Sequence, residues 1–392
     1  MDYDALIIGG GPAGLSTALH LQQIAPQGAP RVLILEKERY PRFKLCAGGL
    51  VIDAEVILQR LGLDVSEVPH VDADTIHFDF EGGGFRFQMK KQHALRIIRR
   101  DEFDNWLAEK VASRGLEIRE GVSVKSITPD QDGVTVETDN GTFRAQLVVG
   151  ADGSNGITRR CIFPNTPVNT ARLLEVITPT QPSPNFFEIR GGQGRGQVAY
   201  FEFSPVPNNI AGYIWDFPTQ ITGEPMRCWG IYDTNILANE KRPQLKEPLA
   251  REMSRLGFDL SDYELKGYPI RWFSPENQMS APRVLLVGDA AGADPLLGEG
   301  ISIALGYGLV AAREISRAFQ RNEFSFSGYR RRVVGSALGQ ALIARWMLAH
   351  VVYPLKWKWF QILLWRFLKP IIVLVASAFV LNWGKRMPGP SP

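Results

Sequence analysis

The sequence is poor in the side chains that build disulfide frameworks and metal sites. Its 392 residues include three cysteines and five histidines, and neither type forms a CxxC pair or a cluster. Odd, scattered cysteines argue against a disulfide framework and a structural zinc site, so we expect no metal ion and a reducing compartment. The hydrophobic share of 45% and the charged share of 22% exclude a disordered or collagen-like chain. The acidic start, Met1 to Asp4, predicts no secretory signal.

Acidic residues are missing from the last part of the chain. The segment 324–392 has no Asp or Glu, but it holds ten of the 44 Lys and Arg residues and five of the nine Trp residues. Basic charge mixed with tryptophan is typical of contact with an anionic membrane surface. The long aliphatic runs between the aromatic residues disfavour nucleic acid as the partner.

Long hydrophobic runs are also missing. Ile371–Leu381 is uncharged, but at about 1.5 Å per residue it is too short for the ~30 Å hydrocarbon core of a bilayer. Lys369-Pro370 separates it from the preceding apolar stretch. We therefore expect helices that lie in one leaflet, with Lys and Arg side chains reaching the headgroups. A true span and a water-soluble helical subdomain packed on the body are the alternatives.

A glycine-rich turn follows the first apolar run of the chain. Ala5–Ile8 leads into Gly9-x-Gly11-x-x-Gly14, and a helical pattern and a second apolar run, Val32–Leu35, come next. This glycine spacing lets the backbone approach a diphosphate at a helix N-terminus, and an acid after the second strand accepts hydrogen bonds from ribose hydroxyls. The pattern predicts a dinucleotide site without separating NAD from FAD, and a glycine turn without a ligand is the alternative. The candidate residues are Gly9, Gly11, Pro12, Ala13, Gly14, Glu36 and Lys37.

A β-rich segment interrupts the nucleotide-binding pattern. Strand-like alternation extends from residue 173 to residue 233 and includes 186–189, after which a buried strand at 284–287 and a long helix return. We expect a mixed α/β fold. Its parts are a Rossmann-type domain in two pieces (1–170 and 276–330), a β-rich substrate domain between them (171–275) and a basic, apolar helical tail (331–392).

A second glycine-rich motif favours FAD over NAD as the bound dinucleotide. Gly288–Gly292 follows the later buried strand, and Gly298–Ile301 opens the long helix. A carboxylate at a strand end can bind a ribityl hydroxyl, and a glycine-lined helix N-terminus can hold the negative charge of a reduced flavin. With Arg100-x-x-Phe103-Asp104 and Gly150–Ser154, these motifs resemble the FAD-dependent oxidoreductases of the para-hydroxybenzoate hydroxylase fold. The resemblance implies that Arg100, Asp152, Gly288, Asp289, Gly298, Gly300 and Ile301 bind or support FAD.

Two further stretches resemble the geranylgeranyl reductase family. Lys44–Gly49 is similar to a segment that runs beside the flavin ring in that family, although Ala47 departs from the usual pattern. The resemblance places Lys44 near the reduced flavin and implies that Cys46 donates a proton or positions the substrate. A solvated lysine and a buried structural cysteine are the alternatives.

The other stretch, Tyr213–Pro218, is similar to the family's Tyr-x-Trp-x-Phe-Pro strand, which lines the cavity for an isoprenoid chain. Tyr213, Trp215 and Phe217 alternate onto one face of a strand and would form a wall for a flat ring and a polyene. A row of ordinary core aromatics is the alternative.

The resemblance implies a membrane-associated FAD-dependent oxidoreductase that saturates C=C bonds of a geranylgeranyl-type prenyl chain by hydride transfer. No other glycine motif of this kind follows a strand, so we expect NADPH or a protein donor to reduce the flavin transiently. A flavin monooxygenase acting on an aromatic or quinone ring is one alternative, and a flavoprotein with a binding or assembly role in a membrane complex is another. The expected partners are a lipophilic small molecule and the cytoplasmic side of a membrane, with peripheral or monotopic attachment through the tail.

Overall fold

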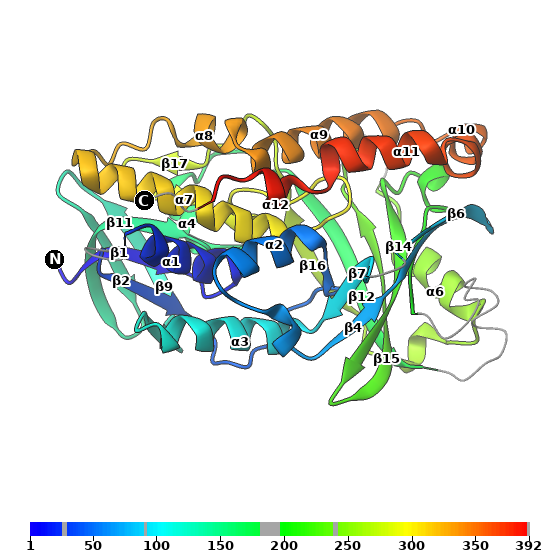
Figure 1. Cartoon of the computed structure of the whole chain (residues 1–392), viewed down its shortest axis with the longest axis horizontal. Coiled ribbons are helices and arrows are strands. Elements are labelled where there is room, and N and C mark those ends of the chain that lie inside the picture. Colours follow the sequence, from blue (N-terminus) through cyan, green and yellow to red (C-terminus); the bar gives the residue numbers. More distant parts are fainter. Residues whose placement is uncertain (26–29, 90–91, 181–196, 238–241, 390–392) are drawn as a thin grey trace.

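The computed structural model describes residues 1–25, 30–89, 92–180, 197–237 and 242–389. Two large sheets lie side by side along the long axis of the molecule, and helices cover them (Figure 1). The predicted mixed α/β class is confirmed, whereas the strand predicted at 186–189 lies outside the described residues.

Eight of the described strands form the first sheet. Its main path is β17-β18-β11-β1-β2-β8, and β10 and β9 extend from β11 as antiparallel strands. The neighbours from β18 to β8 run parallel. The strands are β1 (Tyr3–Ile8), β2 (Val32–Glu36), β8 (Glu117–Glu120), β9 (Val124–Pro129), β10 (Val134–Thr138), β11 (Gly141–Gly150), β17 (Ser280–Ala281) and β18 (Val284–Leu286).

Both faces of this sheet are covered, which explains why Ala5–Ile8 of β1 and Val32–Leu35 of β2 are unbroken apolar runs. Ile7 points into a core shared with α1, α3 and α7, and its neighbours Leu6 and Ile8 point into a second core beneath β9, β10 and α4. Within the first core, α1 packs along α7 and also contacts α3. The helices are α1 (Pro12–Ile24), α2 (Ile52–Arg60), α3 (Arg100–Ser113), α4 (Ile157–Ile162) and α7 (Ile301–Arg321).

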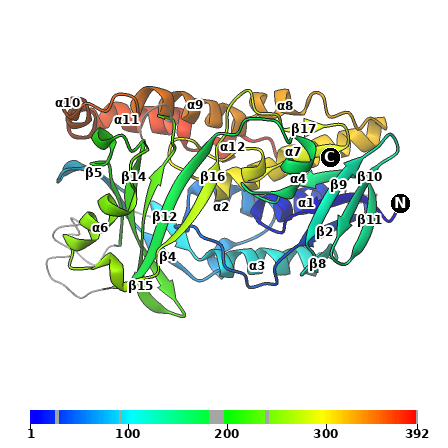
Figure 2. The ribbon, with the colours of Figure 1, turned by 180° about the vertical axis from the view of Figure 1, so that it is seen from behind.

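Seven described strands form the second sheet, in the order β16-β12-β15-β14-β13-β5-β6. All neighbours are antiparallel except β13 and β5. Figure 2 shows α6 (Lys246–Ser254) on the outer side of this sheet, away from the first sheet. The strands are β5 (Thr75–Phe80), β6 (Gly83–Gln88), β12 (Thr170–Pro179), β13 (Val198–Glu202), β14 (Gly212–Ile221), β15 (Glu224–Asp233) and β16 (Lys266–Arg271).

The second sheet extends beyond the predicted β-rich segment 171–275, because β5 and β6 come from the N-terminal part of the chain. The sheet recruits them through the parallel pairing of Ile76 on β5 with Ala199 on β13, a contact that no local sequence pattern signals. The same N-terminal part of the chain forms a small sheet of β3 (Gly49–Leu50), β7 (Leu95–Ile98) and β4 (His70–Ala73).

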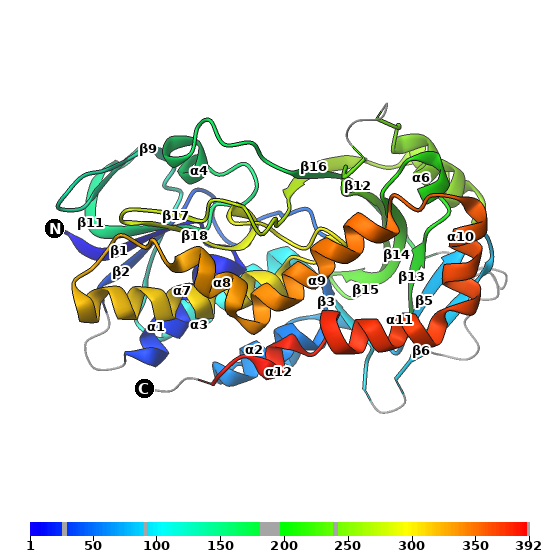
Figure 3. The ribbon, with the colours of Figure 1, turned by 90° about the horizontal axis from the view of Figure 1, so that it is seen from above.

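The tail is helical, as predicted, and packs on the body. Figure 3 shows α9 extending outward over the second sheet, with α10 and α11 turning back towards α12 beside α2. Trp383 is fully buried, and π-helical turns at Leu363–Phe367 and Ala376–Val380 follow α10 and α11. The tail helices are α8 (Tyr329–Gly335), α9 (Ala337–Val352), α10 (Lys358–Ile362), α11 (Lys369–Val375) and α12 (Trp383–Arg386).

Within the described residues, no single helix has the length and apolar character needed to cross a membrane. One pair of segments, Lys358–Phe367 and Lys369–Arg386, passes the same test only jointly and is bent by 77°.

Candidate active site

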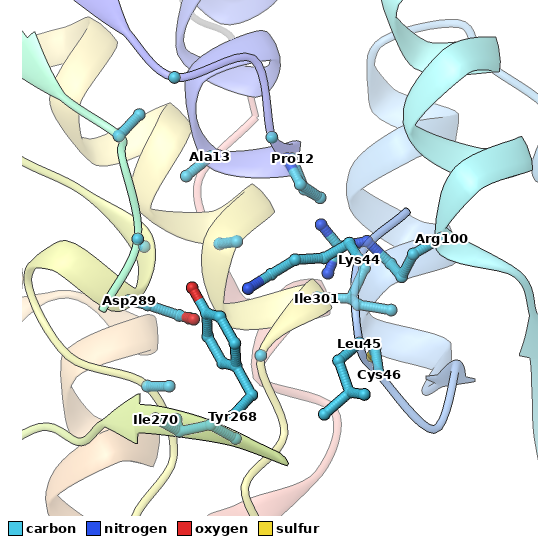
Figure 4. Close-up of a pocket in the computed structure, with 18 of the residues that line it drawn as sticks. Pro12, Ala13, Lys44, Leu45, Cys46, Arg100, Tyr268, Ile270, Asp289 and Ile301 are labelled. Carbon is cyan, nitrogen blue, oxygen red and sulfur yellow. The ribbon is translucent and has the colours of Figure 1, made fainter. Parts of the chain in front are cut away.

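One cavity of about 550 Å³ brings the predicted residues together. Both glycine motifs, the Lys44–Gly49 segment, Arg100 and the aromatic strand line it, and Figure 4 shows a close-up of part of the lining. Of the candidate residues only Gly14 is not in the lining. A Cβ at Gly14 would lie 2.1 Å from the carbonyl oxygen of Gly9, so this glycine lets α1 approach the turn.

The first glycine turn leaves the start of α1 open to the cavity. Gly9 has φ +105°, and a Cβ there would lie 2.4 Å from the carbonyl oxygen of Ala151. Gly11 is the N-cap of α1, and no side chain caps the helix. A Cβ at Gly11 would have only Arg42 within 4 Å, at 3.6 Å. Free N–H groups of the first turn and open space beside Gly11 fit the diphosphate of a dinucleotide.

Glu36 lies at the end of β2 and its side chain faces the turn. It is buried, and its oxygens accept hydrogen bonds from the N–H groups of Gly10 at 2.8 Å and Glu38 at 3.0 Å. Arg42 Nε lies 3.4 Å from Glu36 Oε2. A carboxylate has about four acceptor positions, so Glu36 can still accept hydrogen bonds from ribose hydroxyls. Its neighbour Lys37 is exposed at the cavity edge and pairs with Glu38.

Arg100 and Lys44 bring positive charge into the cavity. Arg100 donates two hydrogen bonds to Asp104, at 2.8 and 2.9 Å. Burial opposes its charge, but Asp104 keeps the pKa of Arg100 above its ordinary value. Lys44 Nζ lies 3.3 Å from the ring centroid of Tyr268, and burial lowers the pKa of Lys44 to about 8 although Asp289 attracts its charge. Figure 4 shows the Lys44 side chain extending towards Asp289 and Tyr268.

The second glycine motif lies against the first. Gly288 has φ +59°, and a Cβ there would lie 2.7 Å from Cβ of Ala13. Asp289 follows and projects into the cavity (Figure 4). Gly300 is the N-cap of α7 and Ile301 its first residue, and the Glu299 carboxylate accepts a hydrogen bond from the N–H of Ser302 at 2.8 Å. Two helix N-termini therefore converge on one cavity, which fits both the diphosphate and the anionic ring of a flavin.

Asp152 lines the cavity, but its side chain points largely into the protein. Its Oδ2 accepts hydrogen bonds from the backbone N–H of Thr158, at 2.7 Å, and from the hydroxyl of Thr158, at 2.9 Å. Burial raises its pKa, and Oδ1 has no hydrogen-bond partner among the described residues. The contacts show Asp152 holding the first turn of α4 in place.

The predicted aromatic row forms the apolar wall of the cavity. Tyr213, Trp215 and Phe217 lie on one face of β14 and are almost fully buried. Phe201 on β13 joins them, with its ring centroid 5.1 Å from Tyr213 and 5.0 Å from Phe217. The Tyr213 hydroxyl donates to the carbonyl of Leu297, next to Gly298. The wall is thereby tied to the second glycine motif.

Cys46 stands where the apolar and charged parts of the cavity meet. Its Sγ accepts a weak hydrogen bond from the N–H of Gly48 at 3.4 Å. Burial raises the pKa of the thiol although Arg100 opposes that shift, so Cys46 carries its proton at neutral pH.

Sequence reasoning missed several residues of the site. Tyr268 on β16 faces Lys44, and both Tyr268 and Ile270, two residues apart on this strand, line the cavity. Arg42 bridges Glu36 and Asp104, with 3.2 Å to the latter. No local pattern indicates these two contacts, since the partners come from different elements.

Comparisons with known proteins agree with this geometry. Residues 2–191 match the model of the FAD binding domain. A geranylgeranyl bacteriochlorophyll reductase-like protein from Thermoplasma acidophilum has the same fold, with a TM-score of 0.73 at 21% identity over 98% of both chains.

Two curated relatives differ in activity. The chain is 26% identical to digeranylgeranylglycerophospholipid reductase 3 of Methanosphaera stadtmanae, over 83% of this chain and 80% of the relative. It is 33% identical to the rifampicin monooxygenase of Streptomyces venezuelae, but over only 44% of this chain and 37% of that enzyme. The chain is therefore an FAD-dependent oxidoreductase that carries an FAD binding domain in a geranylgeranyl reductase-like fold.

Proposed function

We propose that the protein reduces C=C bonds of a prenyl chain of the geranylgeranyl type. The observation that carries this proposal is the wall of Phe201, Tyr213, Trp215 and Phe217 in the same cavity as the two glycine motifs. Four aromatic rings beside a cofactor favour an apolar substrate over a small polar one. A long apolar chain gains roughly 0.8 kcal/mol for each methylene that it buries against such a wall.

Some residues of the cavity would hold the cofactor, and others would contact the substrate. FAD supplies the hydride when it is bound and reduced. The starts of α1 and α7, together with Arg100, hold its negative charges, and Glu36 and Asp289 accept its hydroxyl hydrogen bonds. Trp215 and its neighbours orient the prenyl chain and exclude water. Cys46 carries a thiol proton at the junction of the two regions.

The extent of the two likenesses favours reduction over oxygenation. The match to the monooxygenase covers 44% of this chain, whereas the match to the prenyl lipid reductase covers 83% of it. NADPH or a protein donor would reduce the flavin.

The test uses holoprotein whose flavin has been reduced chemically without oxygen. On mixing with a geranylgeranyl lipid, we expect the flavin absorbance to return as the flavin is reoxidised. Trp215→Leu should slow this step at least about tenfold, a loss of about 1.4 kcal/mol. Trp229→Leu is the matched control, because Trp229 is an equally buried tryptophan on β15 that packs under α6. Reoxidation that needs oxygen rather than the lipid would contradict the proposal.

We also propose that the tail attaches the protein to the cytoplasmic side of a membrane. Among the described residues, all exposed large apolar side chains other than Met1, Phe43 and Val168 lie between residues 347 and 379. Clustered exposed apolar side chains in a segment that has basic but no acidic residues support contact with an anionic lipid surface. The exposed tail residues are Met347, Val351, Trp357, Trp359, Leu363, Phe367, Ile371, Leu374 and Phe379.

A further inference from the structure

A buried glutamate lies directly behind Cys46. Glu175 is on β12 and is 5% exposed. Its carboxyl lies near the backbone N–H of Cys46 and the thiol of Cys228, and the three residues line one void. Its Oε2 is buried without a hydrogen-bond partner among the described residues. A buried polar atom without a hydrogen bond lowers the stability of the fold, so its presence indicates a functional role.

Cys46 separates two spaces. On one side is the cavity with the aromatic wall, and on the other is a void of about 10 Å³ that Glu175 and Cys228 line. A void of this size holds about one water molecule. Arg99 and Asp101 line it too, and their side chains are 17% and 32% exposed. Glu175 therefore shares the void with two partly exposed charged side chains.

Burial leaves the Glu175 carboxyl about half protonated at neutral pH. It raises the pKa of Glu175 to about 7, against the lowering effect of the Cys46 N–H, the Cys228 thiol and the positive charges of Arg99 and Lys266. The other titratable or charged groups that face the void are Lys44, Arg100 and Asp101.

We propose that Glu175 is a proton-relay residue that replenishes the proton of the Cys46 thiol after that thiol has protonated the substrate. This inference rests on the proposed reduction of a C=C bond. Glu175 acts through Cys46 and does not touch the substrate.

The proton and electron count closes. One alkene carbon takes the hydride, and the other takes the proton from Cys46, so that an S–H bond breaks and a C–H bond forms. The thiolate then takes the proton of the Glu175 carboxyl, and the S–H bond forms again. The Glu175 carboxylate finally regains a proton from solvent through the void beside Arg99 and Asp101.

The first test measures Cys46 itself and needs no turnover. Holoprotein is treated with iodoacetamide at pH 6 to 9.5, and alkylation of the Cys46 peptide is followed by mass spectrometry. A Glu175 carboxylate raises the pKa of Cys46. Glu175→Gln should therefore speed alkylation above pH 7 at least about threefold, because a neutral neighbour lets the thiolate form at lower pH. An unchanged pH profile would overturn the inference.

A matched control excludes a general effect of losing a buried carboxyl. Glu202 on β13 is fully buried, and burial raises its pKa to about 7 as well, but it bonds to Tyr200 and Ser204 away from the cavity. Glu202→Gln should leave the alkylation of Cys46 unchanged.

The second test measures reoxidation of reduced flavin by a geranylgeranyl lipid over the same pH range. The wild-type rate should fall above about pH 7, as the Glu175 carboxyl loses its proton. Glu175→Gln should be at least about tenfold slower below pH 7 and lose this dependence, and Glu175→Asp should restore part of it. A Glu175→Gln variant with the wild-type rate and profile would overturn the relay. A wild-type protein that no prenyl lipid reoxidises would refute the proposed function instead, and would leave the alkylation result standing.

Discussion

The hydroxyl of Tyr213 donates a hydrogen bond to the carbonyl oxygen of Leu297 at 2.5 Å. Tyr213 belongs to the aromatic wall on the second sheet, and Leu297 precedes the glycines that open α7 in the nucleotide-binding part. The bond links the two halves of the cavity, which come from different sheets. In the tail, the hydroxyl of Tyr353 donates a hydrogen bond of 2.5 Å to the carbonyl oxygen of Leu296.

Tyr213→Phe should loosen this link without removing the ring. The lost hydrogen bond and the unpartnered Leu297 carbonyl should lower the free energy of unfolding by about 1 kcal/mol. FAD should bind more weakly, since the loop before α7 loses an anchor. Denaturant unfolding and FAD titration measure both effects. If stability and FAD affinity are both unchanged, the hydrogen bond contributes neither to folding nor to FAD binding.

Gly9→Ala should abolish FAD binding. The added Cβ would overlap the backbone of Ala151 at 2.4 Å, so the turn must move. Gly141→Ala is the control, because Gly141 has a similar φ of +97° with no atom within 4 Å of its Cβ position. Both variants bear the strain of a positive φ, about 1–2 kcal/mol, but Gly141→Ala should keep its FAD. Equal FAD content in the two purified variants would contradict this prediction.

Arg345→Met should destabilise the protein by about 3–5 kcal/mol. The Arg345 side chain is 2% exposed, lies 3.4 Å from Glu299 and 3.8 Å from Asp294, and donates to the carbonyl of Val380 at 2.9 Å. Its loss leaves two buried carboxylates without their cation and releases the tail from the cavity edge.

The matched control for Arg345 is Arg251→Met, which breaks an exposed pair with Glu247. Exposed pairs contribute at most about 1 kcal/mol, so this variant should unfold close to the wild-type midpoint. The prediction fails if the two methionine variants lose the same stability.

Lys44 should give FAD-free protein a stability that rises with pH in an alkaline window. Burial lowers its pKa in the folded state from 10.5 to about 8. Between those values the unfolded chain binds a proton that the folded chain lacks, so the free energy of unfolding increases as the pH rises. Lys44→Met removes the titrating group and should flatten this part of the profile. Parallel profiles of the two proteins between pH 8 and 10.5 would refute the assignment.

The exposed tail side chains should govern attachment to lipid. Phe367→Ser with Leu374→Ser replaces two side chains that are each 68% exposed. Sedimentation with vesicles that contain anionic lipid should weaken at least about tenfold. The control replaces Phe43 and Val168, which are 56% and 44% exposed outside the tail, and it should bind vesicles like the wild type. An equal loss of vesicle binding in both variants would show that binding depends on exposed apolar side chains in general and not on the tail.

Local patterns made much of the site predictable. The spacing of Gly9, Gly11 and Glu36 reflects one β-turn-α-β unit, and the alternation of Tyr213 and Trp215 reflects one strand. Each signal lies within a short stretch, so sequence reasoning reaches it.

Contacts between distant segments were not predictable in this way. The parallel pairing of Ile76 with Ala199 depends on how the chain crosses between sheets. Arg345 belongs to a basic tail that suggested exposure to headgroups, yet its partners Asp294 and Glu299 bury it. Glu175 sits in a strand of ordinary alternation, and its neighbour Cys46 comes from a loop far away in the sequence.

The most direct measurement is the mass of the product after anaerobic incubation of reduced holoprotein with a geranylgeranyl lipid. We expect a gain of two hydrogen atoms for each double bond that is lost, with no oxygen in the reaction. A product that forms only in air and carries an added oxygen atom, or a lipid recovered unchanged beside a flavin that stays reduced, would contradict the account.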